Sequence, residues 1–279
     1  MATMYVGAAA IATRRMFFEH KGKSTHAMKL SPAHIPKDRV ALVTGAARRI
    51  GAAIAEALHA AGMRVAIHCR QSEGEARQLC ERLNAARPDS AEVFRFDLVE
   101  SGSPEALIDA VDNWAGRLDV LVNNASTFYP TPLGKIREED WADLVGSNLK
   151  APLFLAQAAR GLLSANDGCI VNIVDIHAKK PLRDHHVYGA AKAGLTMLTL
   201  SLAKDLAPRV RVNGIAPGAI AWPESGMPES IKELILAEVP LGRTGEPGDI
   251  ARTVMFFVLD APYVTGQILA VDGGRSIGW

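Results

Sequence analysis

The stretch RVALVTGAARRIG, residues 39–51, decides the fold. Its first part is a β-branched and apolar run, Arg39–Thr44, and an alanine-rich helical pattern, Ile50–Ala61, follows a turn that contains Gly45 and ends at Gly51. A turn of this kind brings backbone N–H groups and the positive end of a helix up to a pyrophosphate. The Gly-x5-Gly spacing alone is weak evidence, because it also fits any tight strand-to-helix turn.

Beyond this stretch, short apolar runs alternate with helical patterns, which is typical of a parallel sheet with crossover helices. We predict an α/β fold: a single Rossmann-type, doubly wound, seven-stranded parallel sheet with helices on both faces, over residues 38–279. The expected strands are Arg39–Thr44, Arg64–Cys69, Glu92–Phe96, Val120–Val122, Ile170–Val174, Arg211–Ile215 and Gln267–Val271. The expected helices are Ile50–Ala61, Glu75–Ala86, Pro104–Ala115, Glu138–Leu163, Tyr188–Leu206 and Pro247–Leu259, the fourth divided in two at Asn148, and Ala219–Glu238 is expected to be irregular.

Composition excludes several classes of protein. With 279 residues and a net charge of +1, the chain has no strongly basic surface for nucleic acid. Three cysteines without CxxC spacing predict neither a disulfide framework nor a zinc site. No apolar run reaches the roughly 18 residues that span a membrane, so a cytoplasmic protein is expected. Residues 1–37 are interpreted as a disordered extension, with Met28 as a possible true start; a functional extension is the alternative.

The end of the second expected strand predicts the cofactor. A dinucleotide fold that uses NAD places an acid there, but this chain has His68, Cys69, Arg70, Gln71 and Ser72. No acid in this segment would repel a 2′-phosphate, and Arg70, with Arg48 and Ser72, offers groups that suit NADPH. The alternative is a solvated loop arginine.

Four motifs in order resemble the short-chain dehydrogenase/reductase family. They are Thr44–Gly51, Asn123-Asn124-Ala125, Tyr188-x3-Lys192 and Pro217-Gly218, and the resemblance extends from Arg39 to the C-terminus. It implies catalytic roles for Tyr188, Lys192 and Asn148, the last through a water near Lys192, and a homotetramer formed through the helices that carry Asn148 and Tyr188. Together with the strand ends, it assigns cofactor contacts to Gly45, Arg48, Arg49, Ile50, Gly51, His68, Arg70, Gln71, Ser72, Asp97, Leu98, Asn124, Ala125, Ser126, Tyr188, Lys192, Pro217 and Gly218.

Tyr188 and Lys192 are four residues apart, so they share one face of a helix. A nearby ammonium favours a phenolate, and we therefore expect the pKa of Tyr188 to lie below its usual value of about 10. A hydroxyl with such a pKa is a usable proton donor near neutrality.

Asp175 stands thirteen residues before Tyr188, where the family has a serine that donates to a substrate carbonyl. An ionised carboxylate only accepts hydrogen bonds and would repel the oxyanion of carbonyl reduction, whereas a carboxyl paired with a tyrosine could deliver a proton to the nitrogen of a C=N bond.

An aspartate there resembles the pteridine reductase branch, as do Arg49 and the run Asn124–Phe128. By this resemblance Phe128 stacks on a pterin, and Arg49 and Ser126 contact polar groups of pterin and cofactor. The alternatives are a packed Phe128, an Arg49 paired with a helix carboxylate, and an Asp175 that caps the following turn.

The predicted activity is NADPH-dependent reduction of a pterin C=N bond (in biopterin, dihydromonapterin or dihydrofolate), with substrate contacts from Arg49, Ser126, Phe128, Asp175 and Tyr188. A carbonyl reductase and a non-catalytic NADPH-binding protein are the rival readings. His177, His185 and His186 are interpreted as a solvated loop rather than a metal site, because no acid or cysteine lies at ligand spacing. Trp222 and Pro223 fall in a segment that closes over substrate in the family.

Overall fold

Seven strands form one parallel sheet in the order β3-β2-β1-β4-β5-β6-β7. The computed structural model describes residues 38–222 and 226–277, so the predicted extension 1–37 and Pro223 lie outside the described residues. The strands are β1 Val40–Val43, β2 Arg64–Cys69, β3 Ala91–Arg95, β4 Val120–Asn123, β5 Cys169–Ile173, β6 Arg211–Pro217 and β7 Ile268–Val271. The predicted α/β fold with seven parallel strands is confirmed.

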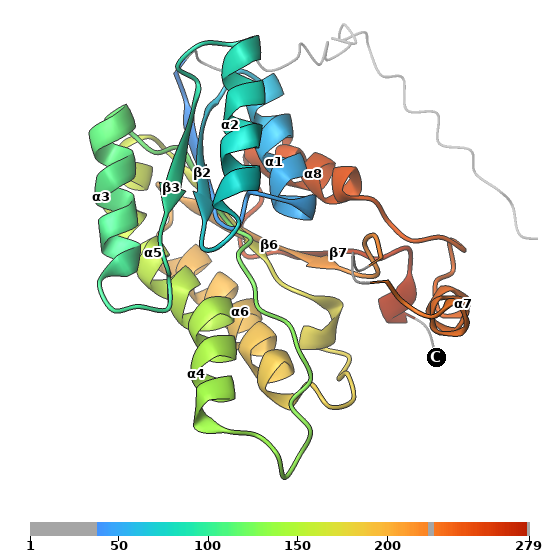
Figure 1. Ribbon diagram of the computed structural model, residues 1–279. Helices are drawn as coiled ribbons and strands as arrows, with labels where there is room; N and C mark the ends of the chain where they lie inside the picture. Colours follow the sequence, from blue (N-terminus) through green and yellow to red (C-terminus); the bar gives the residue numbers. More distant parts are fainter. Residues whose placement is uncertain (1–37, 223–225, 278–279) are drawn as a thin grey trace, which may run out of the picture. The chain divides into compact units, whose positions relative to one another are not determined.

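Helices cover both faces of this sheet (Figure 1). They are α1 Arg49–Ala60, α2 Glu73–Ala86, α3 Ser103–Ala115, α4 Glu138–Val145, α5 Ala151–Ala165, α6 His186–Asp205, α7 Glu229–Ala237 and α8 Pro247–Met255. The predicted division at Asn148 is confirmed: one π-helical turn, Gly146–Lys150, separates α4 from α5. The expectation of an irregular Ala219–Glu238 is wrong in part, because α7 lies within it.

Alternate residues of β1 face opposite layers, as the two-residue period of a strand requires. Ala41 and Val43 pack with the buried side chains of α1, α2 and α8. Val40 and Leu42 pack with those of α3, α5 and α6. Because β1 is buried on both faces, its sequence is a continuous apolar run rather than an alternating one.

The connections reverse direction between β1 and β4, since β2 and β3 lie on one side of β1 and the later strands on the other. At such a switch point the loops that leave the carboxyl ends of the strands diverge and open a crevice, where open α/β sheets bind ligands. The loops after β1, β2, β3, β4 and β5 carry many of the residues that the sequence singles out. Within the described part of the chain, no helix is long and apolar enough to cross a bilayer.

Candidate active site

The turn between β1 and α1 is held against the end of β4. Thr44 Oγ1 accepts the backbone N–H groups of Asn124 and Ala125, each at 2.9 Å, and Asn124 Nδ2 donates to the carbonyls of Thr44 and Gly45. Gly45 has a φ of +60°, and a Cβ at Gly51 would lie 2.2 Å from the Gly45 carbonyl oxygen. The two glycines therefore let the chain fold back on itself and leave the start of α1 facing the crevice.

His68 supports this turn from the next strand. Its Nδ1 accepts the Gly45 N–H at 3.1 Å, while its Nε2 lies 3.1 Å from the Phe96 carbonyl oxygen, so Nε2 carries the proton. Burial lowers the pKa of His68 to about 4, which keeps the ring neutral. The sequence predicts that His68 contacts the cofactor. In the structure its ring also connects the turn after β1 to the residue that follows β3.

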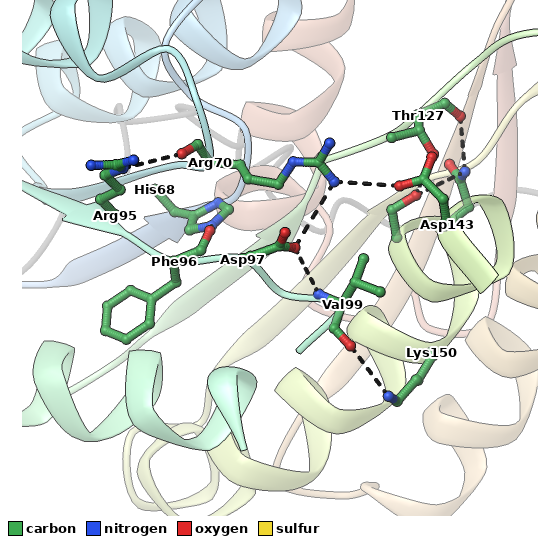
Figure 2. A network of polar contacts seen from close by, with 11 residues as sticks. His68, Arg70, Arg95, Phe96, Asp97, Val99, Thr127, Asp143 and Lys150 are labelled. Atoms are coloured by element: carbon green, nitrogen blue, oxygen red, sulfur yellow. Dashed lines mark hydrogen bonds and ion pairs between the residues drawn. The ribbon is translucent and has the colours of Figure 1, made fainter. Parts of the chain in front are cut away.

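Arg70 lies between two carboxylates that the sequence did not connect with it (Figure 2). Its Nη1 is 3.4 Å from Asp143 Oδ1 and 3.9 Å from Asp97 Oδ1. Asp143 belongs to α4, 73 residues further along the chain, so no local spacing could reveal it. The segment 68–72 contains no acid, as predicted, but other parts of the chain bring two carboxylates to Arg70, and these carboxylates would oppose a 2′-phosphate.

A cavity of about 680 Å³ joins the predicted residues. Of those assigned to cofactor or substrate, the ones that line it are Gly45, Arg48, Arg49, Ile50, Gly51, His68, Arg70, Gln71, Ser72, Asp97, Leu98, Asn124, Ala125, Ser126, Phe128, Asp175, Tyr188 and Gly218. Asn148, Lys192 and Pro217 lie behind this lining rather than in it. Sequence reasoning missed Ser147, His177 and Arg275 as lining residues, although Ser147 directly precedes Asn148 and His177 lies two residues after Asp175.

Asp175 follows β5 and uses both of its carboxylate oxygens. Tyr188 OH donates to Oδ2 at 2.6 Å, and the backbone N–H of His177 donates to Oδ1 at 2.8 Å. Pairing with Tyr188 and capping of the next turn are alternatives on sequence grounds, and the structure contains both. The cap fixes the orientation of the carboxyl group that Tyr188 meets.

Tyr188 does not have the lowered pKa that the sequence predicted. Burial, the charge of Asp175 and the hydrogen bond to it raise the pKa of Tyr188, and a hydrogen bond with Ser126 acts weakly in the opposite direction. The Lys192 ammonium is fully enclosed and donates to the Ile173 carbonyl at 2.9 Å. Its Nζ lies 5.7 Å from the centre of the Tyr188 ring, and burial lowers the pKa of Lys192 to about 8 despite the charge of Asp175. The Asp175 carboxylate therefore affects the pKa of the Tyr188 hydroxyl more strongly than the Lys192 ammonium does.

Asn148 occupies the π-helical turn between α4 and α5. Its Nδ2 donates to the carbonyls of Thr127 and Leu144, both at 2.9 Å, and its Oδ1 accepts the Ser126 hydroxyl at 2.7 Å. Asn148 thus ties the wide helical turn to the loop that follows β4. The predicted link to Lys192 runs through a water and remains a prediction.

Phe128 projects into the cavity with 56% of its surface exposed. One face stacks on His185 with ring centres 4.6 Å apart, and the ring meets Tyr188 edge-on at 4.8 Å. The interpretation of His185 as part of a solvated loop is therefore wrong, because it supports Phe128 from 57 residues further along the chain. The described residues contain no cluster of His, Cys, Asp or Glu that could hold a metal.

Arg49 begins α1 with a φ of 52°, a conformation that favours glycine. Its Nη2 lies 3.4 Å from the carbonyl oxygen of Ile220 and 3.5 Å from that of Ala221, so it reaches the segment after β6 rather than a helix carboxylate.

Comparisons with known proteins find similar sequences among reductases. A family model described as enoyl-(acyl carrier protein) reductase matches residues 45–276. The chain is 38% identical to "Pteridine reductase 1" of Leishmania tarentolae, over 87% of this chain and 98% of that protein. It is 36% identical to "3-oxoacyl-[acyl-carrier-protein] reductase FabG" of Staphylococcus aureus (84% and 96%) and 37% identical to "3-oxoacyl-[acyl-carrier-protein] reductase" of Synechocystis (85% and 96%).

Proposed function

Because the chain belongs to the short-chain dehydrogenase/reductase family, whose reductases use nicotinamide cofactors, we propose that it is an NADPH-dependent pterin reductase. The hydrogen bond of 2.6 Å between Tyr188 and Asp175 carries this proposal. A carboxyl group at this position cannot donate to a carbonyl oxygen while ionised, but it can exchange a proton with the tyrosine that serves a ring nitrogen.

The cofactor end of the cavity fits a dinucleotide. Gly45 and Gly51 leave room that a Cβ would fill, and the first turn of α1 presents N–H groups to a pyrophosphate. Arg70, Gln71 and Ser72 line the part of the cavity beyond β2, where the ribose of the adenosine would lie. The cationic and hydroxyl groups there support NADPH rather than NADH.

The substrate end suits a flat heterocycle. Phe128 offers an exposed aromatic face beside Tyr188, and flat aromatic rings stack favourably on such a face. Ser126 lies within hydrogen-bond reach of both Tyr188 and Asn148, so it can fix the tyrosine hydroxyl beside a bound ring. Arg49 lines the same cavity and provides donors for pterin or cofactor oxygens.

Protonation is the part of the reaction that this chain's own residues carry out. When bound, NADPH supplies a hydride to the carbon of a pterin C=N bond. For the reaction, Asp175 first takes a proton from solvent. Tyr188 then gives its hydroxyl proton to the adjacent nitrogen and takes the proton of Asp175, so that a C–H and an N–H bond form and Asp175 returns to the carboxylate that accepts the Tyr188 hydroxyl in the structure. This relay avoids a phenolate beside a carboxylate, which the raised pKa of Tyr188 shows to be unfavourable.

A 3-oxoacyl reductase is the rival, because relatives of that name are about as similar to the chain as the pteridine reductase. The test is NADPH oxidation with dihydrobiopterin, dihydrofolate, a simple ketone and an acetoacetyl thioester. We expect kcat/KM to be at least about a hundredfold higher for a pterin than for either carbonyl compound, equivalent to about 2.7 kcal/mol of transition-state binding. A higher value for the thioester would contradict the proposal and assign Asp175 to another role.

A further inference from the structure

The arginines around the proposed 2′-phosphate position are already paired with carboxylates. Arg70 is held by acids from two other elements, and its neighbours have partners on α2. The pairs are Arg48–Glu75 at 3.7 Å, Arg70–Asp97 at 3.9 Å, Arg70–Asp143 at 3.4 Å and Arg95–Glu73 at 3.2 Å. A 2′-phosphate that binds here must therefore compete with carboxylates for the cations.

Asp143 is the acid best placed to compete. It lies nearer to Arg70 than Asp97 does, and both carboxylates share the single nitrogen Nη1 instead of forming a two-pronged pair. Asp97 has a second task, since its Oδ1 accepts the Val99 N–H at 3.1 Å. Asp143 is held in place by Tyr129, whose pKa is raised by burial, by the charge of Asp143 and by a hydrogen bond to that carboxylate.

On the basis of the proposed use of NADPH, we propose that Asp143 is a specificity-determining residue that weakens the binding of 2′-phosphorylated nucleotides. Its carboxylate competes for Arg70 and repels the phosphate dianion that approaches the same guanidinium. The Arg70 and Asp143 side chains are 37% and 31% exposed, so solvent reduces both effects without removing them. Arg70, in the loop after β2, provides the cation, and Asp143, in α4, determines how strongly that cation binds phosphate.

The test uses Asp143→Asn in the full-length protein. Asparagine keeps the volume of the side chain and can still accept from Tyr129, but it removes the charge. Calorimetry with adenosine 2′,5′-bisphosphate and with 5′-AMP measures the phosphate contribution without any substrate. We expect the variant to bind the bisphosphate about three- to tenfold more tightly than the native protein, with unchanged affinity for 5′-AMP.

Glu139→Gln is the matched control, because Glu139 is an exposed acid on the same helix and lies one turn before Asp143. It should change the affinity for the bisphosphate less than twofold. In an Arg70→Gln background, Asp143→Asn should lose most of its effect if it acts through the guanidinium. An effect of equal size in that background would assign Asp143 a general electrostatic role and overturn the inference.

The outcomes also separate this inference from the proposed cofactor. Equal affinity of the native protein for the bisphosphate and for 5′-AMP would count against NADPH preference. The ratio of the bisphosphate affinities of Asp143→Asn and the native protein tests the role of Asp143, whichever nucleotide the native protein prefers. Unchanged or weaker binding of the bisphosphate by Asp143→Asn would show that the carboxylate orients Arg70 rather than competing for it.

Discussion

At the scale of single residues, Asp175 determines the chemistry that we propose. The His177 N–H donates to its Oδ1, and the Tyr188 hydroxyl donates to its Oδ2. Asp175→Asn therefore keeps the shape of the site but leaves a side chain that cannot deliver a proton to Tyr188. We expect pterin turnover to fall about 10²- to 10⁴-fold, the usual contribution of general acid catalysis, with unchanged NADPH affinity. Single-turnover NADPH oxidation with dihydrobiopterin measures this.

Tyr188→Phe is the companion variant, and the two losses should not add, because the residues act as one unit. Asp175→Ser restores the hydroxyl donor of carbonyl reductases and should raise activity on a small ketone. Unchanged pterin reduction by Asp175→Asn would leave Asp175 as a cap of the His177 turn alone.

Lys192 should set the alkaline limb of the pH profile. Burial lowers the pKa of Lys192 to about 8, so the ammonium is lost as the pH rises through that value. The pKa of Tyr188 is raised, so its hydroxyl keeps the proton over the same range. We expect kcat/KM for NADPH, which reports the free enzyme, to fall above about pH 8. A limb above pH 10 would mean that the amine stays charged, and Lys192→Arg should move the limb upward.

Motif spacing predicted Asp175, Tyr188 and Lys192 as one group, because thirteen residues connect the end of a strand to a helix and four residues connect two turns of that helix. It could not predict the direction of the Tyr188 pKa, which depends on burial and on the distance to a carboxylate. It also missed the stacking of His185 on Phe128, because the two residues are far apart in the chain and no motif connects them.

At the scale of elements, the turn between β1 and α1 depends on Gly51. A Cβ there would lie 2.2 Å from the Gly45 carbonyl oxygen and 2.7 Å from Asn124 Nδ2, so Gly51→Ala must displace the turn. We expect at least about tenfold weaker NADPH binding and a loss of stability of about 1–3 kcal/mol, the usual result of overpacking. Fluorescence titration and thermal unfolding measure the two effects.

Gly161→Ala is the matched control. Gly161 lies in α5, and a Cβ there would meet nothing within 4 Å. Alanine should stabilise that helix by about 0.5–1 kcal/mol and leave cofactor affinity unchanged. Native NADPH affinity in Gly51→Ala would show that the turn has room that the structure does not indicate.

Element boundaries followed from the sequence where hydrophobic period and glycines agreed, as at β1 and α1. The break between α4 and α5 was foreseen from Asn148, a residue that favours neither helix interior nor apolar packing. The helix α7 was missed because Gly226 and Pro228 precede it and it spans only nine residues, although Ile231, Leu234 and Ile235 lie at helical spacing.

At the scale of the whole molecule, the predicted homotetramer remains a prediction. Trp141, Leu153, Met197 and Leu200 are exposed apolar side chains on α4, α5 and α6, the helices that the family resemblance assigns to subunit contacts. We expect Met197→Glu to lower the oligomeric state, because it places a charge in an apolar contact. Sedimentation of the native and Met197→Glu proteins measures the oligomeric state. Leu234→Glu on α7, with the same exposure of 65%, is the control and should leave the assembly intact. A native monomer would contradict the prediction directly.

The Thr44 hydroxyl has a consequence for how the protein is made. It accepts backbone N–H groups from residues 80 and 81 positions further along the chain, so the turn is not complete when β1, α1 and β2 have formed. On a ribosome, the first half of the sheet would emerge with an open nucleotide loop, and only the docking of β4 would close it. Contacts between such distant residues form slowly, because a long loop must first be closed. We therefore expect affinity for nucleotide to be acquired late in folding, and a nascent chain that ends before Asn124 should gain no stabilisation from a nicotinamide cofactor.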